Sequence, residues 1–130
     1  MTTTRTKSSA AALAAGILLF TASPPASAKA GDVVRTGRCT GASTWKLKVK
    51  PDNGRIEAEF EVDQNRNGVR WTVLMGDNGV RVFTGSAVTV APSGSFEVNR
   101  RIPNRAGTDT IVARATNPAT GEVCRGTAVL

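Results

Sequence analysis

A strict two-residue alternation on both sides of a short turn is the feature that most constrains this fold. In "STWKLKVK" (residues 43–50) apolar side chains alternate with lysines, and in "RIEAEFEV" (residues 55–62) they alternate with charged side chains. A period of two places the apolar side chains on one face of a half-buried strand. Between the segments, Pro51-Asp52-Asn53-Gly54 supplies the fixed and positive φ angles of a tight turn. These features predict a β-hairpin.

A four-residue turn predicts a register for this hairpin in which the numbers of facing residues add up to 105. Lysines then face glutamates on one side and apolar residues face each other on the other side, as Lys48–Glu57, Lys46–Glu59, Trp45–Phe60 and Val49–Ile56. Charge pairs on one face and apolar pairs on the other favour a single register.

The same alternation recurs along the rest of the chain. Residues 69–75 turn at residues 76–79 into residues 80–85, and residues 95–101 follow the turn at residues 92–94. Residues 109–116 are joined through residues 117–121 to residues 122–130, and residues 33–39 add one short edge strand. No segment longer than a turn shows a helical period. The sequence therefore predicts an all-β protein of seven main strands, arranged as a sandwich rather than as a barrel.

The amino-terminal residues have the pattern of a signal peptide. Arg5 and Lys7 precede an uncharged apolar run over residues 10–20, and Ala26-Ser27-Ala28 matches the small residues that signal peptidase requires. The run is shorter than the roughly 20 residues that span a bilayer. We therefore expect residues 1–28 to be removed, residues 29–130 to form one β-sandwich domain, and the protein to be secreted with no membrane span.

Cys39 and Cys124 are the two cysteines of the chain, and both lie in the part expected to be exported. An even pair in an oxidising compartment predicts a disulfide. Two isolated cysteines lack the CxxC arrangement that tunes a redox-active thiol. Removing a disulfide of this kind from a small secreted domain typically lowers its stability by about 2–5 kcal/mol.

The segment from Trp45 to Leu130 resembles an immunoglobulin-like or fibronectin-type-III-like sandwich. The Lys/Glu hairpin corresponds to the first two strands of such a domain, and Trp71 to the core tryptophan of the third. "GTDTIVARATNPATGEVCRG" is similar to the last two strands of bacterial immunoglobulin-like domains. The whole chain also resembles small secreted actinobacterial proteins of unknown function. The cysteines differ from the immunoglobulin pattern, since Cys39 precedes the first main strand. Many functions share this fold, so the resemblance implies none of them.

"DQNRNG", which starts at Asp63, matches the opening half of a calcium-binding loop. An EF-hand loop also needs a bidentate glutamate at its twelfth position and flanking helices. That position is Leu74, the flanks are predicted strands, and Arg66 lies among the candidate ligands. We interpret Asn67-Gly68 as a turn between two strands, and we predict neither a metal site nor a cofactor.

The residue types needed for common catalytic sites are missing from the sequence. Without histidine there is no imidazole base and no Ser-His triad, and a disulfide leaves no thiolate nucleophile. Glu57, Glu59 and Glu61 lie on one strand face, where each faces a lysine or solvent, and this arrangement is a poor glycosidase pair. Glycines occur singly in turns, so no phosphate-cradling loop is predicted. We therefore expect a protein that is not an enzyme.

One arginine-rich face is the candidate functional site. On the sheet that contains Trp71, the opposite face is expected to carry Arg70, Leu74, Arg81, Phe83, Val112, Arg114 and Arg125. Pairing the last two strands so that Ala115 faces Cys124 places Arg114 opposite Arg125. This face is either solvated surface or a site for an anionic partner, such as a cell-envelope polymer or another extracellular protein. Nucleic acid is not expected as a ligand, because a single aromatic side chain accompanies the arginines.

The sequence contains a second basic cluster. Arg100, Arg101 and Arg105 are expected to lie in solvent at a strand end and in a loop.

Two classes of function are consistent with the sequence. The first class is a non-catalytic extracellular binding or structural module. The alternative is a small secreted inhibitor or ligand carrier, for which the loop over residues 103–108 is the candidate inhibitory segment.

Overall fold

The computed structural model describes residues 31–130, and the expected signal peptide with its cleavage site lies outside these residues. The described chain is all-β, so it has no helix that could cross a membrane. Its eight strands are β1 (Val33–Arg38), β2 (Thr44–Asp52), β3 (Arg55–Asp63), β4 (Arg70–Asp77), β5 (Val80–Val88), β6 (Ser95–Pro103), β7 (Thr110–Thr116) and β8 (Val123–Val129). The predicted seven main strands and one edge strand are confirmed.

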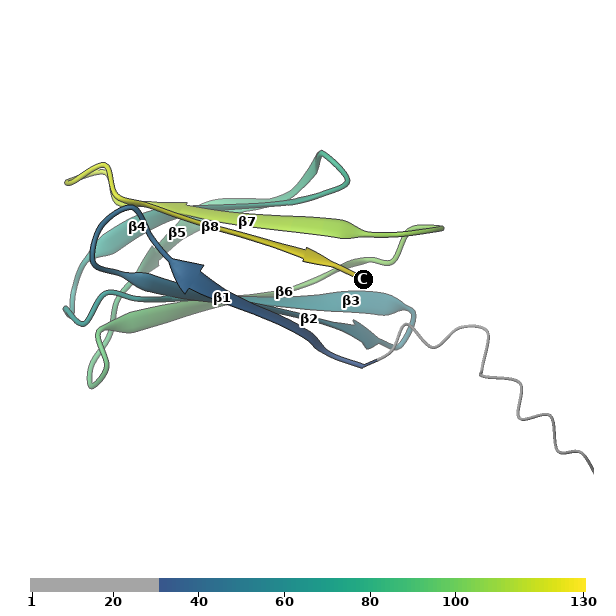
Figure 1. The fold of residues 1–130 in the computed structure, drawn as a ribbon, viewed down its shortest axis with the longest axis horizontal. Coiled ribbons are helices and arrows are strands. Elements are labelled where there is room, and N and C mark those ends of the chain that lie inside the picture. The colour runs from purple at the N-terminus through teal and green to yellow at the C-terminus, as the bar shows by residue number, and fades with distance from the viewer. Residues whose placement is uncertain (1–30) are drawn as a thin grey trace, which may run out of the picture.

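The strands form two antiparallel sheets that face each other (Figure 1). One four-stranded sheet has the order β1-β2-β3-β6 and the other has the order β5-β4-β7-β8. The two edge strands β5 and β6 lie on one side of the sandwich, and β1 and β8 lie on the other. The predicted sandwich is therefore confirmed, and each sheet has one face on the core and one face outward.

The predicted register of the first hairpin is wrong by two in the sum of facing residue numbers. In the structure Lys46 faces Glu61, Lys48 faces Glu59 and Lys50 faces Glu57. Asn53 and Gly54 have φ angles of 48° and 75°, so they alone form the turn. Two successive positive φ angles are typical of a type I′ hairpin turn, which lets Pro51 and Asp52 continue the strand. The alternation of faces survives, because a shift of two residues keeps every side chain on its side.

The core lies between the sheets and includes the predicted third-strand tryptophan. Trp71 is fully buried, and its ring lies 6.2 Å from the ring of Phe96 in the opposite sheet. The indole Nε1–H of Trp71 donates a hydrogen bond of 3.0 Å to the side-chain oxygen of Gln64. This bond satisfies the one polar atom of a large apolar side chain, which makes its burial favourable.

The side of the sandwich at β1 and β8 is closed by a covalent bond and by an aromatic ring. Cys39 and Cys124 form the predicted disulfide, which joins the end of β1 to β8. The ring of Trp45 lies against Gly37 of β1 and Gly126 of β8, where a Cβ atom would come within 2.6 Å and 2.5 Å of it. Trp45 of one sheet therefore packs directly on the backbone of the other.

The loop that contains the calcium-like motif is held by protein groups. The carboxylate of Asp63 accepts a hydrogen bond from the backbone N–H of Asn65 at 2.9 Å. Asn65 and Gly68 adopt φ angles of 54° and 76°, as turn residues do. The hydroxyl of Thr89 donates to the backbone oxygen of Arg66 at 2.6 Å. The loop is thus a tight connection that carries the chain from one sheet to the other.

Candidate functional site: an arginine-bearing sheet face

The outward face of the sheet β5-β4-β7-β8 follows from the alternation along β4. Trp71, Val73 and Met75 are buried, so the intervening side chains of β4 point outward. Facing residues of neighbouring strands lie on the same side of a sheet. We call this surface the arginine face, and it carries Arg70, Thr72, Leu74, Arg81, Thr84, Val112, Arg114, Thr116, Arg125 and Thr127.

One row of side chains crosses all four strands of this face. Leu74 faces Thr84 on one side and Arg114 on the other. Arg114 in turn faces Arg125, as the sequence predicted, because Ala115 faces Cys124. The row therefore runs from a hydroxyl through an apolar side chain to two neighbouring guanidinium groups.

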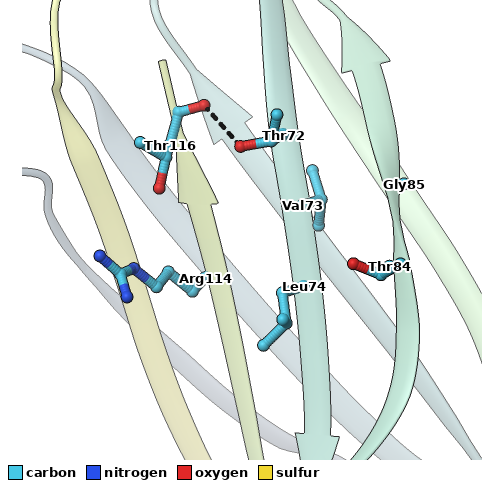
Figure 2. Close-up of a pocket in the computed structure, with 7 residues that line it drawn as sticks. All are labelled: Thr72, Val73, Leu74, Thr84, Gly85, Arg114 and Thr116. Carbon is cyan, nitrogen blue, oxygen red and sulfur yellow. Dashed lines mark hydrogen bonds between the residues drawn. The ribbon is translucent and has the colours of Figure 1, made fainter. Parts of the chain in front are cut away.

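A shallow hollow lies over this row. It has a volume of about 540 Å³ and is lined by Thr72, Val73, Leu74, Thr84, Gly85, Arg114 and Thr116. Figure 2 shows the side chain of Arg114 on one side of the hollow and that of Thr84 on the other, with Leu74 between them. The hydroxyl of Thr72 donates to the backbone oxygen of Thr116 at 3.2 Å, which ties β4 to β7 at the end of the hollow (Figure 2).

A second hollow adjoins the first and places Arg81 on the same face. Its volume is about 270 Å³, and it is lined by Leu74, Gly76, Gly79, Arg81 and Val112. The register of β4 and β5 shifts between Met75 and Gly76, so that Gly76 faces Arg81. An extra residue in β5 therefore turns Arg81 outward, as β-bulges commonly do with a side chain.

The prediction that Phe83 belongs to this face is wrong. Phe83 faces buried Met75 across the strands, so its ring points to the inner side of the sheet and packs against the core. The guanidinium of Arg100, from β6 of the other sheet, lies 4.3 Å from the centre of that ring. The bulge is the physical reason, because it reverses the alternation between Arg81 and Phe83. Among residues 31–130, no aromatic side chain remains on the arginine face.

The described strands place no acidic residue on the arginine face. None of its positions on β4, β5, β7 and β8, among residues 31–130, holds an aspartate or a glutamate. All four side chains are exposed. An exposed cluster of one charge sign concentrates positive potential on that side of the molecule.

The three arginines of the second basic cluster lie in separate places and do not act together. Arg100 covers Phe83 at the open side of the sandwich, where it makes a cation–π contact. The next residue, Arg101, points to the other face of β6 and forms an ion pair of 3.1 Å with Asp52. Arg105 lies in the loop between β6 and β7. All three are exposed as predicted, but they form no common site.

The three glutamates considered as catalytic candidates lie on the outer face of the other sheet. The side-chain amide of Asn99 donates to Glu57 at 2.7 Å, and this hydrogen bond lowers the pKa of Glu57. Partial burial is the main cause that raises the pKa of Glu59. Glu61 faces Lys46.

The chemistry available on the arginine face is hydrogen bonding and charge. Guanidinium groups donate in a planar fork to oxyanions, and threonine hydroxyls both donate and accept. Thr84 and Thr116, which line the main hollow, are not among the site residues predicted from the sequence. Their positions in the alternation of β5 and β7 were the signal that could have found them. No known family model and no curated protein sequence matches the chain.

Proposed function

We propose that the protein is a secreted, non-catalytic β-sandwich module that binds an anionic partner at the cell envelope through its arginine face. The observation that carries this proposal is the group of four exposed arginines on a face whose described strand positions hold no acidic residue. Two of them, Arg114 and Arg125, face each other directly. Like charges in that position are unfavourable for the free protein and favourable for an anion placed between them.

Secretion is supported by two further observations. The Cys39–Cys124 disulfide is typical of oxidising compartments, and residues 1–28 have the sequence pattern of a signal peptide. The sheet order β5-β4-β7-β8 opposite β1-β2-β3-β6 supports the resemblance to immunoglobulin-like and fibronectin-type-III-like sandwiches. Such a scaffold presents a rigid outer sheet face, on which side chains are fixed by the strands.

The partner that fits this face is a polyanion other than a nucleic acid. Recognition of single-stranded nucleic acid depends on aromatic side chains on which bases stack. With Phe83 on the inner side, the described part of the arginine face offers none. Guanidinium groups and hydroxyls instead suit a polymer that carries phosphate or carboxylate groups.

The test is retention on isolated cell wall and on an anionic matrix, with wild type compared to Arg81→Gln/Arg114→Gln. We expect the variant to elute at lower salt, because fewer positive charges attract the anionic surface and salt screens the attraction that remains over a Debye length of about 8 Å at physiological ionic strength. The matched control is Arg38→Gln/Lys46→Gln, which removes the same charge from the outer face of the other sheet. Equal elution of the two variants would contradict the proposal.

The alternative of an inhibitor has its own test. The end of the loop over residues 103–108 is fixed by Asn78, whose amide donates to the backbone oxygen of Thr108 at 3.0 Å. Stoichiometric inhibition of secreted proteases by the purified protein would favour this alternative over a passive module. Substitution of Arg105 would then abolish the inhibition.

A further inference from the structure

The pair Arg114 and Arg125 has a geometry that distinguishes between classes of anion. The two residues face each other across β7 and β8, and Cβ atoms in that position lie about 4.5–5.5 Å apart. Figure 2 shows that the side chain of Arg114 extends away from Leu74, toward the strand that carries Arg125. Two planar donor forks are therefore available to one ligand from adjacent strands.

We propose that Arg114 and Arg125 together bind one phosphate monoester of a polyol or sugar, whose organic part lies in the hollow over Leu74. This inference rests on the proposed function and names its ligand class. A carboxylate has two oxygens in one plane, and a single arginine fork uses both of them. A phosphate monoester has three terminal oxygens in a tetrahedral arrangement and a charge of about −1.5 to −2 at neutral pH. It matches two guanidinium groups in both shape and charge.

The surroundings of the pair favour a hydroxyl-rich organic part. The hollow of about 540 Å³ begins beside Arg114 and is lined by the hydroxyl-bearing Thr72, Thr84 and Thr116 around Leu74. Thr72 already donates its hydroxyl to the backbone of Thr116. The hydroxyls of Thr84 and Thr116 remain to bind polyol oxygens. A nucleotide would need an aromatic platform for its base, which the described residues of this face lack.

Arg114 and Arg125 differ from the other two arginines of the face because they face each other. Arg70 faces Val88 and Arg81 faces Gly76, so neither has a second guanidinium group at its facing position. In the free protein Arg114 and Arg125 repel each other, and a dianion between them replaces that repulsion by two attractions. Binding should therefore depend on both members of the pair.

The experiment measures the binding of two small probes to the purified protein by titration calorimetry. The protein is purified in the form in which the cells produce it. Glycerol phosphate carries the proposed monoester, and glycerate carries a carboxylate on a matching polyol. We expect glycerol phosphate to bind at least about tenfold more tightly than glycerate, since a charge-assisted fork is lost with the carboxylate. Its affinity should rise as the pH increases through about 6, where the phosphate loses its second proton.

Three variants test the assignment to this pair. We expect Arg125→Gln to weaken glycerol phosphate binding about tenfold or more, and Arg125→Lys to restore only part of it, because lysine lacks the planar fork. Arg81→Gln removes the same charge from the same face, and we expect it to change the affinity less than about threefold because charge at a distance is screened. Melting temperatures serve as the folding control for all three.

Two results would overturn the inference. One is equal affinity for glycerol phosphate and glycerate, and the other is an equal loss in Arg81→Gln and Arg125→Gln. Either result leaves salt-dependent retention on cell wall intact, so it refutes the paired site without refuting the proposed function. A protein that neither binds the probes nor is retained on any anionic surface refutes both.

Discussion

The outward faces of the two sheets differ in how their charges are balanced. The outer face of β1-β2-β3-β6, which we call the Lys/Glu face, pairs opposite charges across β2 and β3, although Glu61 also faces Glu97 on β6. Lys48 faces Glu59, and Lys50 faces Glu57 with an ion-pair distance of 3.4 Å. On the arginine face, the residue that faces Arg114 on β8 is another arginine. Positive charges on the Lys/Glu face have negative neighbours, whereas those on the arginine face have none at the described strand positions of that face.

The charged side chains at outward strand positions of the Lys/Glu face are balanced. The basic residues at outward positions are Arg38, Lys46, Lys48, Lys50, Arg55 and Arg101, and the acidic ones are Asp52, Glu57, Glu59, Glu61, Asp63 and Glu97. Six positive charges therefore meet six negative ones on the strands, and Asp32, just before β1, adds a seventh negative charge through its ion pair of 3.3 Å with Lys48. The whole chain has 17 Lys/Arg and 10 Asp/Glu, and three basic residues precede residue 31. The described residues thus carry a net charge of +4 (14 minus 10), which equals the four arginines of the arginine face.

This difference separates the side chains that stabilise the fold from those that the fold presents to the proposed partner. Cross-strand charge pairs on the Lys/Glu face agree with the register and contribute modestly to it. The arginines contribute nothing comparable, and the Arg114–Arg125 pair works weakly against the fold. Side chains that a fold does not need, and that are concentrated on one face, are candidates for binding.

The largest expected effect comes from cutting the covalent bond that joins the two sheets. Cys39→Ser/Cys124→Ser removes a disulfide between residues separated by 85 positions. We expect the free energy of unfolding to fall by about 2–5 kcal/mol, because the unfolded chain regains the freedom of a long loop. Urea unfolding under non-reducing conditions measures it. A loss below about 1 kcal/mol would show that the closed side is held by packing alone.

A smaller effect is expected where the sheets touch without a covalent bond. In Gly126→Ala the added Cβ would come within 2.5 Å of the Trp45 ring, so ring or strand must move. Overpacking of this kind costs about 1–3 kcal/mol of stability. Pairing the change with Trp45→Leu should make the double variant less unstable than the sum of the single ones. Additive losses would contradict a direct contact between them.

A further, smaller effect is expected when the arginine face is given the charge pattern of the Lys/Glu face. Arg125→Glu places an acid opposite Arg114. We expect a gain in stability of about 0.2–1 kcal/mol that declines with salt, together with loss of retention on anionic surfaces. Glu59→Lys makes the converse change opposite Lys48 and should lower stability by a similar amount. Thermal unfolding at low and high salt checks both variants, and a salt-independent change would argue against a charge effect.

Sequence alone predicted most of this architecture, because period-two alternation determines which side of a strand faces the core. It placed Leu47, Phe60 and Trp71 in the core and brought Arg114 opposite Arg125, as the structure does. It misplaced Phe83, because the bulge beside Gly76 is a backbone irregularity with no sequence pattern of its own. The hairpin register failed for a related reason. Turn length decides register, and "PDNG" is compatible with turns of two and of four residues.

The smallest effect tests how the Lys/Glu face keeps two adjacent acids on one strand. The amide of Asn99 donates to Glu57 at 2.7 Å and to Glu59 at 3.3 Å. The first of these bonds is the main cause of the lowered pKa of Glu57. A carboxyl whose pKa is lowered by folding adds stability above its unfolded pKa, and that stability is lost as the pH falls through the folded pKa.

In Asn99→Ala we therefore expect the pKa of Glu57 to rise toward its ordinary value. The variant should be slightly less stable than wild type at neutral pH, and the difference should vanish in acid, where Glu57 is protonated in both proteins. Carboxyl carbon shifts followed by NMR titration measure the pKa directly. Asn99→Gln, which keeps an amide donor, serves as the control. An unchanged pKa in Asn99→Ala would mean that Lys50, rather than Asn99, sets the charge of Glu57, since Lys50 also lowers that pKa.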